Sequence, residues 1–172
     1  MAWDELVLHE QARAAYERGR FHRAAPGALL ALPYWTVGVT TCAEPLVASV
    51  SAVVLAAASV LLLWRGRHFV SALRSGLSAG AVVLAIPLAG MISGLCGSAW
   101  LLCAAAGVVG GATLALGRAR REPSATIAAG VVAALAGAQG CLLLGLPGLL
   151  AMTAGLAAAT APALVPALRH GR

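Results

Sequence analysis

Residues 46–67 read LVASVSAVVLAAASVLLLWRGR, an almost wholly apolar run that ends in two arginines. A helix needs about 20 apolar residues to cross the hydrocarbon core of a bilayer, and this run has that length. Arginine stays on the cytoplasmic side during insertion, and tryptophan favours the membrane interface, where Trp64 would lie. The stretch therefore predicts a transmembrane helix over about 46–64 that ends on the cytoplasmic side.

The other arginines repeat this arrangement along the chain. All 12 basic residues are arginines, and they form four clusters: Arg13/Arg18/Arg20/Arg23, Arg65/Arg67/Arg74, Arg118/Arg120/Arg121 and Arg169/Arg172. Between clusters lie apolar stretches of roughly 40 to 47 residues, each long enough for a helical hairpin. The clusters therefore mark one face of a bilayer, and they predict six spans with both termini in the cytoplasm.

The predicted fold is an all-α integral membrane protein of about six transmembrane helices, preceded by a short cytoplasmic amphipathic helix. Residues 1–23 would be the tail and 24–172 the membrane domain, with spans over about 24–43, 46–64, 76–95, 99–116, 124–144 and 149–168. The first span is the least regular because Pro26 and Pro33 interrupt it. Tyr34 and Trp35 near its middle indicate either helix–helix contact or a tilted, shallow span.

The composition supports a membrane protein and argues against a soluble one. Of 172 residues, 60% are hydrophobic and 10% are charged, whereas a soluble domain has about 25% charged residues. Twenty glycines predict helices packed closely through small residues. The net charge of +6 is explained by topology and by attraction to anionic headgroups, so no direct binding of nucleic acid is expected.

Residues 3–23 are predicted to form one amphipathic helix. Asp4 and Glu5 lie in its first turn and the arginines gather toward its end, as the helix dipole favours. A narrow apolar stripe at helical spacing consists of Trp3, Leu6, Val7, Ala14 and Phe21. Because so short and polar a helix cannot bury this stripe by itself, it needs the membrane surface or a protein partner. Its charges also exclude a secretory signal.

The sequence carries no pattern typical of an enzyme. It has no HExxH motif, no phosphate-binding glycine loop and no nucleophile–base pair. No ionisable residue lies deep inside an expected span, which counts against a pump or a proton-coupled carrier. The four histidines all fall on the cytoplasmic side, and no cofactor is expected. Gln139, within the fifth span, is expected to hydrogen-bond to a neighbouring helix.

The four cysteines are predicted to gather toward the outer side. Cys42 ends the first span, Cys96 lies in the next outer turn, and Cys103 and Cys141 lie about one helical turn inside their spans. One interpretation is a disulfide, metal-binding or oxidant-sensing group that faces an oxidising compartment. The other is that cysteine serves as a small packing residue. No CxxC motif decides between the two, or indicates which metal would bind.

The segment 12–23, ARAAYERGRFHR, followed directly by six short spans, resembles multi-pass membrane anti-sigma factors. These include the NrsF-like proteins and the carotenogenesis regulator CarR. The resemblance implies a regulator in the bacterial inner membrane that holds an extracytoplasmic-function sigma factor and releases it on a signal such as light or oxidative stress. It would thereby control transcription, with carotenoid biosynthesis as one outcome. The tail residues that would bind the sigma factor are Trp3, Leu6, Val7, Tyr16, Arg18, Arg20 and Phe21.

Two other classes of function stay open. A small multi-pass transporter or channel for a metal or other soft solute would use the four outer cysteines, which would then converge on one lumen. The lack of ionisable residues in the spans argues against it. A structural subunit of a larger membrane complex, or a homo-oligomer, is compatible with every feature of the sequence.

Overall fold

All the regular elements in the described part of the chain are helical, as the sequence predicts. The computed structural model describes residues 2–41, 45–93, 99–117, 123–142 and 145–170, and of residues 2–8, 67–68, 99, 123 and 163–170 it describes the backbone alone. In chain order the elements are α1 (Ala2–Ala24), the 3₁₀ helix η1 (Ala25–Ala31), α2 (Leu32–Thr41), α3 (Pro45–Arg65), α4 (Arg67–Ile92), α5 (Ala99–Leu116), α6 (Pro123–Cys141) and α7 (Gly145–His170).

Four of these helices are long and apolar enough to cross a membrane. The candidate spans are Pro45–Arg65, Phe69–Ile92, Ser124–Cys141 and Gly145–Pro162, and Trp100–Leu116 is apolar but shorter. Large apolar side chains cover their outer faces; Leu46 is 75% exposed and Leu150 is 66% exposed. Water disfavours so extensive an apolar surface, whereas lipid accommodates it. The helices are therefore compatible with a membrane protein.

The first expected span, over 24–43, is not one continuous α-helix. The described part of it is divided between η1 and α2, and the two elements meet between Ala31 and Leu32. Pro26 lies at the start of η1 and Pro33 in the first turn of α2. Proline has no N–H to donate and is tolerated in a first turn, where that N–H would have no partner. The two prolines thus fit two short helices better than one long helix.

Two helices begin earlier in the chain than the spans expected within them. The structure starts α4 at Arg67 rather than at about Gly76, so the helix includes Arg74, whose side chain is exposed. Only Gly66 interrupts the chain between α3 and α4, and residues 67–75 contain no helix breaker. Similarly, α7 begins at Gly145 rather than at about Leu149, because a first turn accommodates Pro147.

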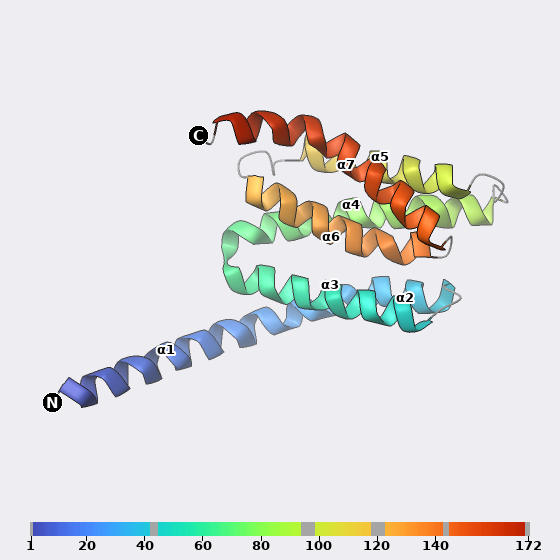
Figure 1. Ribbon diagram of the computed structural model, residues 1–172. Helices are drawn as coiled ribbons and strands as arrows, with labels where there is room; N and C mark the ends of the chain where they lie inside the picture. The colour runs from blue at the N-terminus through green and yellow to red at the C-terminus, as the bar shows by residue number, and fades with distance from the viewer. Residues whose placement is uncertain (1, 42–44, 94–98, 118–122, 143–144, 171–172) are drawn as a thin grey trace.

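The bundle has three layers, each with two rows of helices (Figure 1). In the outer layers α5 packs on α7, and η1 with α2 lies along α3; the middle layer pairs α4 with α6. The body of α1, the α3–α4 turn and the last turns of α7 lie at the same end of the bundle (Figure 1). Helices therefore run up and down between two ends, as the hairpin pattern requires.

Glycines bring the paired helices close together. A Cβ atom placed on Gly76 of α4 would lie 2.7 Å from the Ala129 carbonyl oxygen of α6. One placed on Gly155 of α7 would lie 2.5 Å from the Ala104 carbonyl oxygen of α5. Backbones approach this closely only where the side chain is absent, which is how helices associate without a hydrophobic driving force in lipid. The predicted packing through small residues is thus confirmed for these pairs.

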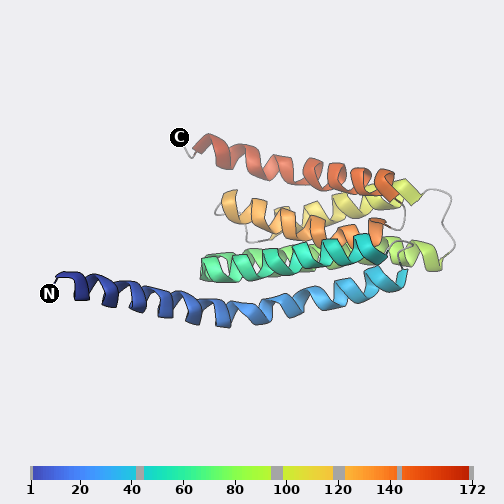
Figure 2. The same cartoon turned by 60° about the horizontal axis from the view of Figure 1, so that its bottom comes forward.

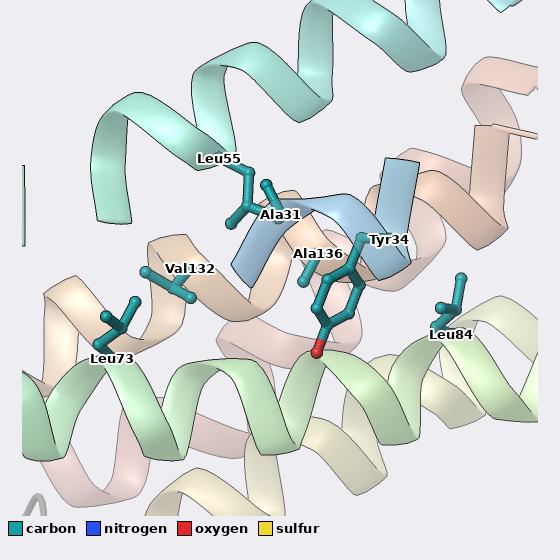
Figure 3. Packing of buried hydrophobic residues seen from close by; sticks show 7 residues of the cluster. All are labelled: Ala31, Tyr34, Leu55, Leu73, Leu84, Val132 and Ala136. Carbon is teal, nitrogen blue, oxygen red and sulfur yellow. The ribbon is translucent and has the colours of Figure 1, made fainter. Parts of the chain in front are cut away.

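Two buried polar side chains tie the layers together. The Tyr34 hydroxyl of α2 donates to the Leu77 carbonyl oxygen of α4 at 2.8 Å, and Figure 3 shows its ring reaching from α2 to α4 among the apolar side chains of this core. The Gln139 amide nitrogen of α6 donates to the Ser51 hydroxyl of α3 at 2.6 Å. Tyr34 therefore makes the helix–helix contact expected as one alternative, and the expected interhelical bond of Gln139 is confirmed.

Candidate functional site

The first part of α1 extends past the end of the bundle and runs along no other helix (Figures 1 and 2). The side chains from His9 to Arg18 are all exposed. Arg13 and Glu17 form an exposed ion pair at 3.2 Å, four residues apart, which stabilises the helix by a few tenths of a kcal/mol. The structure thus presents a helical surface to which a partner has free access.

The last turns of α1 are anchored to the end of α3. A terminal guanidinium nitrogen of Arg20 donates to the carbonyl oxygen of Trp64. The last carbonyls of a helix have no partner within it and carry partial negative charge, so Arg20 caps α3. The Arg20 guanidinium also lies 5.8 Å from the centre of the Tyr16 ring, in the range of a cation–π interaction. Two residues that we expected in a partner interface therefore form a junction within the chain.

A cavity of about 530 Å³ opens at this junction, between α1, α3 and α4. It is lined by Tyr16, Arg20, Arg23, Ala24, Leu63, Gly66 and Val70. Arg23 also donates through Nε to the Gly19 carbonyl oxygen at 3.3 Å, one turn earlier in α1. The cavity is basic on the α1 side and apolar on the side of α3 and α4.

The described residues of the predicted partner-binding set do not share one face of α1. Phe21 follows Tyr16 by five positions, which places it about 140° further round the helix. Phe21 is 54% exposed and Arg18 is exposed, whereas Arg20 is half-buried in the junction. Trp3, Leu6 and Val7 lie in the first two turns of α1, and their side chains are outside the part that the structure describes. Tyr16 and Arg20 line the junction cavity, while Arg18 and Phe21 belong to the outer surface.

Gly66, which is not among the predicted site residues, sets the geometry of the junction. Its backbone has φ 131° and ψ 178°, a conformation that is essentially restricted to glycine. Its signal in the sequence is a single glycine between Arg65 and Arg67 in an otherwise helix-compatible stretch.

We expect Gly66→Ala to lower the free energy of unfolding by about 1–3 kcal/mol, because alanine does not tolerate this backbone conformation. SDS titration of the purified protein, followed by circular dichroism, measures the loss. Gly19→Ala is the matched control, since a Cβ atom on Gly19 of α1 meets nothing within 4 Å. Equal stability of Gly66→Ala and the unmodified protein would contradict the strain argument.

Two of the four cysteines meet in the bundle. Cys103 of α5 and Cys141 of α6 are free and completely buried, and they belong to the same buried cluster. They pack with Val83, Ala106 and Met152. Cys42 and Cys96 lie outside the described residues, so their convergence with this pair, which the transporter hypothesis requires, stays a prediction.

The cysteine pair is suited to thiol chemistry or to packing. Adjacent thiols form a disulfide when two electrons and two protons are removed. Equally, a buried free cysteine behaves as a small apolar residue. Among the described residues no three histidine, cysteine, aspartate or glutamate side chains gather into a metal site.

Comparisons with protein-family models, with curated proteins and with solved structures found no match to this chain.

Proposed function

We propose that the chain is a membrane-bound regulator of the bacterial inner membrane, in which α1 holds an extracytoplasmic-function sigma factor at the cytoplasmic face. One observation carries the proposal: α1 projects from the bundle with exposed side chains, while Arg20 anchors its end on α3. The placement of the bundle as six spans, with both termini in the cytoplasm, is part of the same proposal.

The size and surface of α1 suit a helix that binds in a groove of a folded partner. A helix of 23 residues is about 34 Å long, comparable to the diameter of a small domain. Such helices bind by placing a few large apolar side chains in the groove, and Phe21 on the outer surface supplies one anchor. Trp3, Leu6 and Val7 extend the same apolar stripe in the sequence. The partner would be sequestered as long as this face stays accessible.

The experiment that tests the function uses the full-length chain. A C-terminally tagged copy is expressed in its own cells, extracted in mild detergent and purified, and the retained proteins are identified by mass spectrometry. We expect an extracytoplasmic-function sigma factor to be retained at near-stoichiometric amounts. Retention of no sigma factor by the intact, folded chain would refute the regulatory proposal.

The Cys103–Cys141 pair favours an oxidant as the releasing signal. Hydrogen peroxide, a small uncharged oxidant, would accept two electrons from the two thiols, giving one disulfide and two molecules of water. The new bond would join α5 to α6 where only packing holds them now. A changed arrangement of the bundle releases the partner only if the partner binds the two arrangements with different affinity. Light, the other signal that the resemblance implies, stays a prediction.

Treatment of the purified complex with peroxide is expected to form a Cys103–Cys141 disulfide, seen by mass spectrometry of peptides, and to release the sigma factor. Cys103→Ala and Cys141→Ala should each prevent both events, and dithiothreitol should reverse them in the unmodified protein. Cysteines that form the disulfide without any release would assign the pair to structure rather than to signalling.

A further inference from the structure

The cavity at the α1 junction combines two kinds of surface. On one side are Arg20, Arg23 and Tyr16, whose side chains all carry hydrogen-bonding groups. On the other side are Leu63 of α3 and Val70 of α4. Among the described residues that line it there is no carboxylate to neutralise the two arginines. A ligand that fits this cavity has an anionic part and an apolar part.

The arginines specify the anionic part as a phosphate ester. A guanidinium has five N–H donors in a planar fork that matches phosphate oxygens. Arg20 donates to the Trp64 carbonyl and Arg23 to the Gly19 carbonyl, so each guanidinium is already positioned by one of its donors. Because these bonds use only part of the donor set, both side chains retain N–H groups for a shared anion.

The position of the cavity favours a lipid over a free phosphate. It lies where α3 ends at Arg65 and where the apolar part of α4 begins at Phe69, at the boundary between polar and apolar segments. Trp64, the type of residue that favours the membrane interface, is at the same level. The volume of about 530 Å³ is within the range of about 300–1,000 Å³ typical of small-molecule sites. Basic pockets between membrane helices on the cytoplasmic side recognise anionic headgroups.

We propose that this cavity binds the headgroup phosphate of an anionic glycerophospholipid between Arg20 and Arg23, with its acyl chains along the Leu63 and Val70 side. The bound lipid joins α1 to the α3–α4 turn and so fixes the direction in which α1 leaves the membrane. This site depends on the proposed placement of the bundle in a bilayer. It is independent of the sigma factor, which binds the outer face of α1.

Native mass spectrometry of the full-length protein in detergent tests the site. The protein is titrated with phosphatidylglycerol and with phosphatidylcholine of the same acyl chains. The double variant Arg20→Gln/Arg23→Gln is compared with Arg13→Gln/Arg18→Gln, which removes equal charge from the exposed surface of the same helix. Because Arg20 also caps α3, the single variant Arg23→Gln is included, and circular dichroism verifies that every variant is folded.

We expect one phosphatidylglycerol to stay bound to the unmodified chain and to Arg13→Gln/Arg18→Gln. Binding should weaken about tenfold or more in Arg20→Gln/Arg23→Gln and measurably in Arg23→Gln, since both variants remove charge-assisted hydrogen bonds to the phosphate. Phosphatidylcholine should bind much more weakly. Equal loss in the two double variants, or equal binding of the two lipids, would overturn the site. Displacement of the lipid by millimolar inorganic phosphate would assign the cavity to a soluble phosphate instead.

Discussion

The substitution Gly107→Ala should force α5 and α7 apart and lower the free energy of unfolding by about 3 kcal/mol. This is the upper end of the usual cost of overpacking. The added Cβ atom would overlap the carbonyl oxygen of Met152 and lie 3.0 Å from the amide nitrogen of Leu156. Both neighbours are backbone atoms of a helix, so neither can turn away as a side chain does. The strain is relieved only by moving α7 as a whole.

The effect should also reach α6, because the Met152 side chain packs in the cluster that contains Cys103 and Cys141. SDS titration of the purified protein measures the stability, and the rate of disulfide formation under peroxide reports the position of α5 relative to α6. Gly130→Ala is the matched control: a Cβ atom on Gly130 of α6 meets nothing within 4 Å, and alanine favours a helix over glycine by about 0.5–1 kcal/mol. If the two variants lose stability equally, close packing of α5 on α7 does not stabilise the bundle.

Individual helices were predictable where an apolar run ends in arginine or in an interfacial tryptophan. The run that ends at Trp64 gave an expected span over 46–64, and α3 covers Pro45–Arg65. The expected span begins at about residue 76 because Arg74 lies just before it, whereas α4 begins at Arg67, since residues 67–75 contain no helix breaker. Arginine has a good helix propensity, and its long side chain can extend to the polar interface from inside a helix. The arginines therefore indicate where the apolar segment of α3 ends, whereas Gly66 separates α3 from α4.

The pairing of helices was not predictable from the sequence. Every candidate span is apolar on most of its faces, so no polar stripe indicates which side packs on a neighbour. The choice of α7 as the partner of α5 depends on the fit of Gly107, Gly111 and Gly155 against opposing backbone. The sequence contains many such small residues, and which of them meet is decided only by three-dimensional packing.

The sequence predicts the helix of the candidate site, but it does not predict which side chains of that helix contact the bundle. A helix over 3–23 and its apolar stripe follow from spacing and charge, and the structure has α1 at Ala2–Ala24. The role of Arg20 depends on where the last carbonyls of α3 lie, a contact between residues 44 positions apart. Local patterns carry no information on such a contact. For Cys103 and Cys141, the sequence predicts only that both lie toward the same side of the bundle. It does not predict that they pack together.

Phe21→Ala should weaken binding of the proposed sigma-factor partner by about 30-fold, which corresponds to about 2 kcal/mol for an aromatic anchor at an interface. The Phe21 side chain is 54% exposed, so its removal leaves the bundle itself intact. Tyr16→Ala is the informative comparison, because it removes an aromatic ring of similar size from the other side of the same helix. Tyr16 contacts Arg20 at the junction, and its loss should loosen α1 without removing an anchor from the partner.

Both variants are measured as full-length proteins in nanodiscs, with the co-purifying sigma factor as the analyte in biolayer interferometry. Thermal unfolding followed by circular dichroism verifies that each variant is folded, and Arg13→Gln is a control for an exposed charge that is not in the predicted partner-binding set. A loss of affinity confined to Phe21→Ala places the partner on the outer face of α1. If Tyr16→Ala loses as much affinity as Phe21→Ala, the partner binds the junction face. A partner on the junction face would compete with the bundle for Arg20 and for the cavity beside it. The assignment of the partner to the outer face would then be wrong.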